Sequence, residues 1–268
     1  MEADLLISLI LLGICSGFAA GLLGIGGGMI IVPALTFVFS ASGFSESYTV
    51  HMAIATSLSI IFFTTISSVY AHHKRGAILW PVALLLVPGV IVGSWVGPTI
   101  ASMLNTRYLA SVFGAFVAFS AYKMLRRKKD IKTTGLPNKP MMGMAGLGIG
   151  TAAGLVGAGG GFITVPFLGR RGVSIHNAVA TSAVMGFPIA LFGTLSYIYQ
   201  GWGKADLPPG SMGFIYLPAM VCVAAASVLF APMGARTAHA LNVKQLRSVF
   251  AYLLFVLSAY MFWKAFTG

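Results

Sequence analysis

Acidic residues are scarce in this chain of 268 residues, and cysteines are scarcer still. Carboxylates at membrane depth usually mark proton relays and cation sites, so their scarcity argues against a cation pump. The two cysteines, at positions 15 and 222, offer neither a disulfide framework nor the spacing of a metal site. We therefore expect no metal and no cofactor. The acidic residues all lie near the start of the chain or in predicted loops: Glu2, Asp4, Glu46, Asp130 and Asp206.

Charge of either sign is also sparse, at 8% of the residues, whereas 57% are hydrophobic. Soluble domains usually carry about 25% charged residues, so this chain must bury its apolar surface in lipid. Runs of about 20 apolar residues are long enough to span a bilayer as helices, and they lack the alternating period of a barrel. The sequence therefore predicts an all-α polytopic membrane protein. The plainest runs are 5–23, 50–70, 78–104, 108–125, 176–199, 214–235 and 246–266.

The net charge of +12 is compatible with nucleic acid binding. The basic residues, however, sit in short loops between apolar runs, where membrane topology places them. We therefore expect the lipid bilayer, and not nucleic acid, as a partner. The longest basic run, KMLRRKKDIK at 123–132, is typical of a cytoplasmic loop that orients the chain. Contact with lipid headgroups is the alternative function for this run.

A glycine-rich stretch, GLLGIGGGMIIVP at 21–33, returns in the middle of the chain as GLVGAGGGFITVP at 154–166. Counted from Gly17 and Gly150, 12 of 17 aligned positions are identical. The chain therefore consists of two homologous halves, 1–125 and 141–268, joined by a polar linker at 126–140. Further matches follow in the same order: His51–Ser57 with His176–Ser182, Pro81 with Pro218, and Leu104–Phe113 with Leu241–Phe250.

The two halves either point the same way in the membrane or are inverted. If each glycine segment crosses the membrane once, 11 of the 17 Lys and Arg residues lie inside. If each folds back as a helix hairpin, the repeats are inverted and 14 of the 17 lie inside. The positive-inside rule favours inverted repeats. This arrangement places the linker 126–140 in the cytoplasm and both termini outside.

The length of the second glycine segment agrees with a hairpin. Residues 141–168 are too many for one straight span and too few for two full ones. Two shorter helices that meet at the glycines would fit. Each half then holds a glycine-broken helix hairpin plus three spanning helices, giving about 8–10 transmembrane segments in the whole chain.

Glycine runs weaken helical continuity, and broken backbone in a membrane is tolerated where it is packed in protein or lines a cavity. Secondary transporters place such broken helices at corresponding positions of their repeats, facing a site at the midplane. The helix that follows each break offers free N–H groups, which suit an anion. For the GGG triplets we favour a backbone-lined site, and for the earlier glycines close helix packing. The candidate substrate-binding glycines are Gly26, Gly27, Gly28, Gly159, Gly160 and Gly161.

A second repeated motif, Ala-Thr-Ser, adds hydroxyl groups to this hypothesis. Thr56, Ser57, Thr181 and Ser182 either bond to carbonyls of their own helices or contact the substrate. His51 and His176 lie five residues before these threonines, near the starts of their helices. Each histidine is interpreted as an interfacial cap or as a cavity-edge residue that gates the path or takes up a proton.

An enzyme is disfavoured, because the chain has no HExxH motif and no paired acids, and its Gly43-Phe44-Ser45 lies in a polar loop. An anion held by neutral donors fits the composition better. An anion channel of similar architecture remains the alternative to a carrier. The sequence leaves the oligomeric state open.

The paired GxxGxGGGxxxVP motifs, each followed by His-x-Ala-x-Ala-Thr-Ser, resemble those of the sulfite exporter TauE/SafE family of membrane permeases. The resemblance covers nearly the whole chain. It implies transport of a small sulfur-containing or organic anion, such as sulfite, a sulfonate or a sulfoacetate-like compound, across the bacterial inner (plasma) membrane. The family motif falls on these residues: Gly24, Gly26–Gly28, Val32 and Pro33, and Gly157, Gly159–Gly161, Val165 and Pro166.

Overall fold

The protein is an all-α polytopic membrane protein, seen in a computed structural model that describes residues 3–23, 27–125, 135–238 and 243–267. Five of the described helices are long and apolar enough to cross a membrane, and shorter apolar helices accompany them. The helices of the first repeat are α1 (Ala3–Leu23), α2 (Gly28–Ala41), α3 (Thr49–Lys74), α4 (Trp80–Met103) and α5 (Thr106–Leu125). Those of the second are α6 (Lys139–Val156), α7 (Gly161–Arg170), α8 (Ile175–Gly201), α9 (Leu217–Ala238) and α10 (Val243–Thr267).

Two predicted spans begin a few residues before their helices do. The run at 214–235 begins in a small antiparallel hairpin of β1 (Ser211–Met212) and β2 (Ile215–Tyr216), and α9 starts only at Leu217. The run at 78–104 likewise starts its helix at Trp80. Pro81 and Pro218 explain both shifts, because proline is favoured in the first turn of a helix and lacks the N–H needed further inside.

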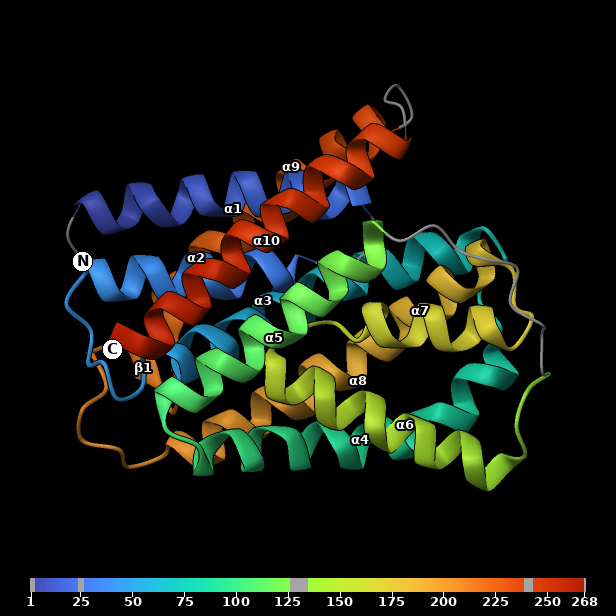
Figure 1. Ribbon diagram of the computed structural model, residues 1–268, viewed down its shortest axis with the longest axis horizontal. Helices are drawn as coiled ribbons and strands as arrows, with labels where there is room; N and C mark the ends of the chain where they lie inside the picture. Colours follow the sequence, from blue (N-terminus) through green and yellow to red (C-terminus); the bar gives the residue numbers. More distant parts are fainter. Residues whose placement is uncertain (1–2, 24–26, 126–134, 239–242, 268) are drawn as a thin grey trace.

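Corresponding helices of the two repeats run in opposite directions along the long axis of the bundle (Figure 1). The start of α1 and the end of α10 lie at one end, which we call the termini end. The start of α6 lies at the other end, toward which α5 runs, and we call it the linker end (Figure 1). The side of the membrane that each end faces stays a prediction.

The most extensive contacts between helices have equivalents between the corresponding helices of the two halves. Helix α4 packs against α6 and, correspondingly, α9 packs against α1, while α3 packs against α8 and α5 against α10. Glycines allow these close approaches. A Cβ added to Gly17 would lie 2.5 Å from the Cα of Ser227, and one added to Gly154 would lie 2.9 Å from the Cδ of Pro98. The packing interpretation of Gly17 and Gly154 therefore holds in this structure.

Candidate functional site

The two glycine breaks meet inside the bundle. A Cβ added to Gly28 would lie 2.6 Å from the carbonyl oxygen of Gly157 and 3.0 Å from the Cα of Ala158. The hydroxyl of Ser57 donates a hydrogen bond of 3.0 Å to the same Gly157 oxygen. Gly27, Gly28 and Gly157 are buried, so the contact lies in the interior. Gly26 lies outside the described residues.

The breaks sit near the midpoints of the two central helices, α3 and α8. Ile61 of α3 faces both of them, because its Cδ1 would lie 2.9 Å from a Cβ on Gly28 and its Cγ2 3.6 Å from one on Gly159. Ile189 of α8 closes over Gly160, where its Cδ1 would lie 2.5 Å from an added Cβ. The residues that meet here carry no charged side chain.

The two breaks differ in backbone conformation. In the second, Gly157 ends α6 with φ 73° and Gly160 precedes α7 with φ 72°, both in the left-handed region that favours glycine. In the first, Gly27 precedes α2 with φ −68°. Gly27 and Gly160 are equivalent in the two repeats, so equivalent residues adopt different conformations.

The second break presents free backbone donors. The N–H groups of Ile163 and Thr164 both bond to the Gly160 oxygen, at 3.1 and 2.9 Å. The N–H groups of residues 159 to 162 have no acceptor among the described residues. The first four N–H groups of an α-helix have no partner within the helix, and together with the helix dipole they suit a negative charge. Gly160 and Gly161 are buried and Gly159 is half-buried, so these donors lie in the interior.

Thr56 and Thr181 hold the repeats together. The Oγ1 of Thr56 accepts a hydrogen bond of 3.1 Å from the N–H of Tyr216, just before α9. The Oγ1 of Thr181 accepts one, also of 3.1 Å, from the N–H of Leu79, just before α4. Each threonine thus bonds to the other repeat, at equivalent positions, and both are fully buried. Neither alternative from the sequence, a bond to the same helix or to substrate, describes this pairing.

The two serines of the repeated motif make different bonds. Ser57 bonds across to the second break, as described above, whereas Ser182 donates to the Val179 oxygen of its own helix at 2.8 Å. Ser57 is fully buried and Ser182 is 5% exposed. Only Ser57 therefore links its helix directly to a glycine break among the described residues.

The two histidines also occupy different environments. His51 is buried, and its Nε2 lies 3.0 Å from the carbonyl oxygens of both Ala101 and Leu104 at the end of α4. This nitrogen donates to the carbonyls, so His51 caps the end of α4. His176 is exposed at the start of α8. The structure brings neither histidine against the glycine breaks in any described contact.

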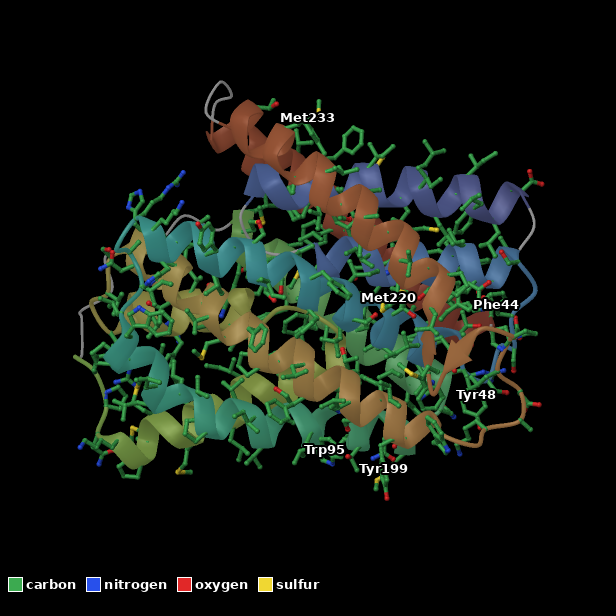
Figure 2. The ribbon with its side chains drawn as sticks, turned by 180° about the vertical axis from the view of Figure 1, so that it is seen from behind. Phe44, Tyr48, Trp95, Tyr199, Met220 and Met233 are labelled. Atoms are coloured by element: carbon green, nitrogen blue, oxygen red, sulfur yellow. The ribbon has the colours of Figure 1, made fainter. Side chains whose placement is uncertain are left out.

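An aromatic cluster lies at the termini end of the bundle. The His51 ring stacks on Phe214 at 5.4 Å between centroids, and Tyr48 lies 5.3 Å from the same Phe214 ring. Phe44 and Tyr216 pack edge to face at 5.1 Å. Figure 2 shows Phe44 and Tyr48 at this end, beside the β1–β2 hairpin. We call the following residues the aromatic cluster: Phe39, Phe44, Tyr48, His51, Phe214 and Tyr216.

The sequence reasoning did not select this cluster, although the repeats carry a signal for it. Aligned on the matched histidines and prolines, Tyr48, Phe214 and Tyr216 correspond to Val173, Ala77 and Leu79 of the opposite repeats. The aromatic side chains therefore belong to one end of a pseudo-symmetric protein. This one-sided distribution can be read from the sequence alone.

Comparisons with known proteins agree that this is a membrane protein. The family model of the sulfite exporter TauE/SafE matches residues 9–261. A probable membrane transporter protein of Haemophilus influenzae is 36% identical over 256 residues, which cover 95% of this chain and 97% of that protein. A probable membrane transporter protein of Methanocaldococcus jannaschii is 26% identical over 256 residues, 94% of each chain. No solved structure matches the chain. The chain is a membrane transporter that belongs to the sulfite exporter TauE/SafE family.

Proposed function

We propose that the protein is a secondary transporter for a small sulfur-containing or organic anion, such as sulfite, a sulfonate or a sulfoacetate-like compound. The observation that carries the proposal is the meeting of two glycine breaks, Gly27–Gly28 and Gly157–Gly161, between the midpoints of α3 and α8. Secondary transporters bind their substrates at paired helix breaks of this kind. The sulfur preference rests on the family to which the chain belongs.

An anion suits this place better than a cation. The N–H groups of residues 159–162 place positive partial charge at the site. None of the residues that meet there carries a carboxylate. Backbone donors bind an anion without a fixed positive charge that would have to be buried when the site is empty. Release of the anion is then not opposed by a permanent ion pair.

Transport by alternating access is the mechanism that the two repeats favour. In this mechanism the aromatic cluster would close the termini end, because Tyr48, Phe214 and Tyr216 correspond to the smaller Val173, Ala77 and Leu79 at the linker end. Equivalent glycines 27 and 160 adopt different conformations, −68° and 72° in φ. Exchange of these conformations between the repeats would convert a state closed at one end into a state closed at the other.

The orientation belongs to the same proposal. The linker end, with the basic run at 123–132, faces the cytoplasm of a bacterial inner membrane, and both termini lie outside. Reporter tags at each terminus and in the linker test this orientation in intact cells. Accessible tags at both termini are expected, and a protected C-terminal tag would contradict the inverted arrangement.

Flux measurements on purified protein in liposomes test the function itself. Sulfite, methanesulfonate, sulfate and an amino acid are supplied in turn, with and without a pH gradient. Uptake of sulfite or methanesulfonate that saturates with concentration is the expected result. Uptake that rises linearly without saturation would identify a channel, and absence of anion uptake would overturn the proposal.

A further inference from the structure

Thr164 carries a buried hydroxyl without a partner, close to the second glycine break. The residue has no exposed surface, and its Oγ1 has no hydrogen-bond partner among the residues that the structure describes. Buried hydroxyls in proteins are nearly always paired with protein, water or a ligand, because an unpaired one is costly. This hydroxyl therefore needs an explanation.

The inward face of α7 places this hydroxyl beside the break. The buried residues of α7 are Gly161, Thr164 and Leu168, which share one face of the helix. The Cα–Cβ bonds of a helix tilt toward its N-terminus, so a side chain at 164 leans over the first turn. The equivalent residue of the first repeat, Ile31, leans over its first turn in this way. Its Cδ1 lies 3.2 Å from the place of a Cβ on Gly27, in the first break.

The hydroxyl stays free because its usual partner is already occupied. A threonine in a helix ordinarily bonds to the carbonyl oxygen four residues earlier, which here is that of Gly160. That oxygen already accepts the N–H groups of Ile163 at 3.1 Å and Thr164 at 2.9 Å. By contrast, Thr36 of α2 makes the ordinary bond, to the Val32 oxygen at 2.8 Å.

We propose that Thr164 donates a hydrogen bond to the transported oxyanion, beside the free N–H groups of residues 159–162. The inference rests on the proposed function and names the side chain that recognises the substrate at that site. It also makes the site asymmetric, because Ile31 offers only an apolar surface at the equivalent place. The anionic oxygens therefore bind at the second break, and the first break contacts the rest of the substrate.

The test compares four variants with the wild type, with sulfite and methanesulfonate as probes. Thr164→Val keeps the shape and removes the hydroxyl, whereas Thr164→Ser keeps the hydroxyl. Loss of a hydrogen bond to a charged group is expected to raise the KM for both anions about tenfold in Thr164→Val. The kcat should change little, and Thr164→Ser should restore the KM to within about twofold of wild type.

Thr194→Val is the matched control, because the Thr194 hydroxyl on α8 is also buried without a described partner. Its KM should equal that of the wild type. The double variant Ile31→Thr/Thr164→Val moves the hydroxyl to the first break and should not restore the KM. A wild-type KM in the double variant, or an unchanged KM in Thr164→Val, would overturn the inference. The proposed function would still stand in either case, because the wild type transports the anions. A wild type that transports neither anion would overturn both.

Discussion

Gly28 and Gly157, which are 129 positions apart in the sequence, touch in the interior, where an added Cβ on Gly28 would lie 2.6 Å from the Gly157 oxygen. The contact joins the helix break of one repeat to that of the other. Contact between backbones at this distance leaves no room for any side chain at position 28. The requirement for glycine there is therefore steric, in addition to any effect on helical continuity.

Gly28→Ala should separate the two breaks. The new methyl group overlaps backbone atoms of Gly157 and Ala158, which cannot move aside as a flexible side chain would. We expect a loss of about 1–3 kcal/mol of stability, the usual cost of overpacking, and a strong fall in anion flux. Thermal unfolding in detergent and flux in liposomes measure the two effects.

Gly148→Ala provides the control for this substitution. Gly148 is exposed on α6, and nothing lies within 4 Å of its added Cβ. Alanine favours a helix over glycine, so stability should be unchanged or rise by a few tenths up to about 1 kcal/mol. If both variants behaved alike, the contact between the breaks would have no special role.

Thr56→Val should weaken the link between the repeats. It removes the acceptor for the buried N–H of Tyr216, which costs about 1–3 kcal/mol. Thr181→Val should cost a similar amount, because its bond to Leu79 is equivalent. Thr267→Val, which loses only an exposed bond to its own helix, should unfold at the wild-type temperature. Equal melting temperatures in all three variants would refute this role.

Phe214→Ala should open the termini end. Its ring contacts Tyr48 and His51 within the aromatic cluster, so removing it leaves a gap over the central helices. A Ser57→Cys reporter, in a background with both native cysteines replaced by alanine, should then react faster with a membrane-impermeant maleimide. Phe63→Ala, which removes an exposed ring of α3, serves as the control. An unchanged rate in Phe214→Ala would place the closure elsewhere.

The ion pair between Lys264 and Glu46, with Nζ and Oε1 3.1 Å apart, should respond unequally to loss of its partners. The Lys264 side chain is 7% exposed, whereas that of Glu46 is 70% exposed. Glu46→Gln leaves a buried ammonium without its counter-charge and should cost about 1 kcal/mol or more. Lys264→Met leaves only a solvated carboxylate and should be nearly neutral. Thermal unfolding of the two variants tests this order, and the reverse order would contradict it.

Much of the fold was predictable because the sequence is duplicated. Apolar runs of spanning length predict the helices, and the identical glycines of the two copies predict a break at the same place in each repeat. The starts of α4 and α9 were predicted two or three residues early, although Pro81 and Pro218 mark them. Proline in the first turn of a helix is a local signal that the apolar runs concealed.

The bonds of the candidate site were harder to predict, because their partners are distant in the sequence. Thr56 bonds to a backbone N–H 160 positions away, and no sequence motif predicts such a partner. The differences between equivalent residues were hidden for the same reason. His51 and His176 share a motif, yet one caps α4 and the other is exposed, since the surrounding residues are not repeated.

The central claim is that an anion passes through the paired breaks, and the concentration dependence of sulfite uptake into liposomes tests it most directly. Wild-type uptake should saturate. Gly160→Val should abolish it while the variant still inserts into the membrane, because position 160 has φ 72° and faces Ile189. Saturable wild-type uptake that persists undiminished in Gly160→Val would contradict the account and reduce the glycines to packing elements.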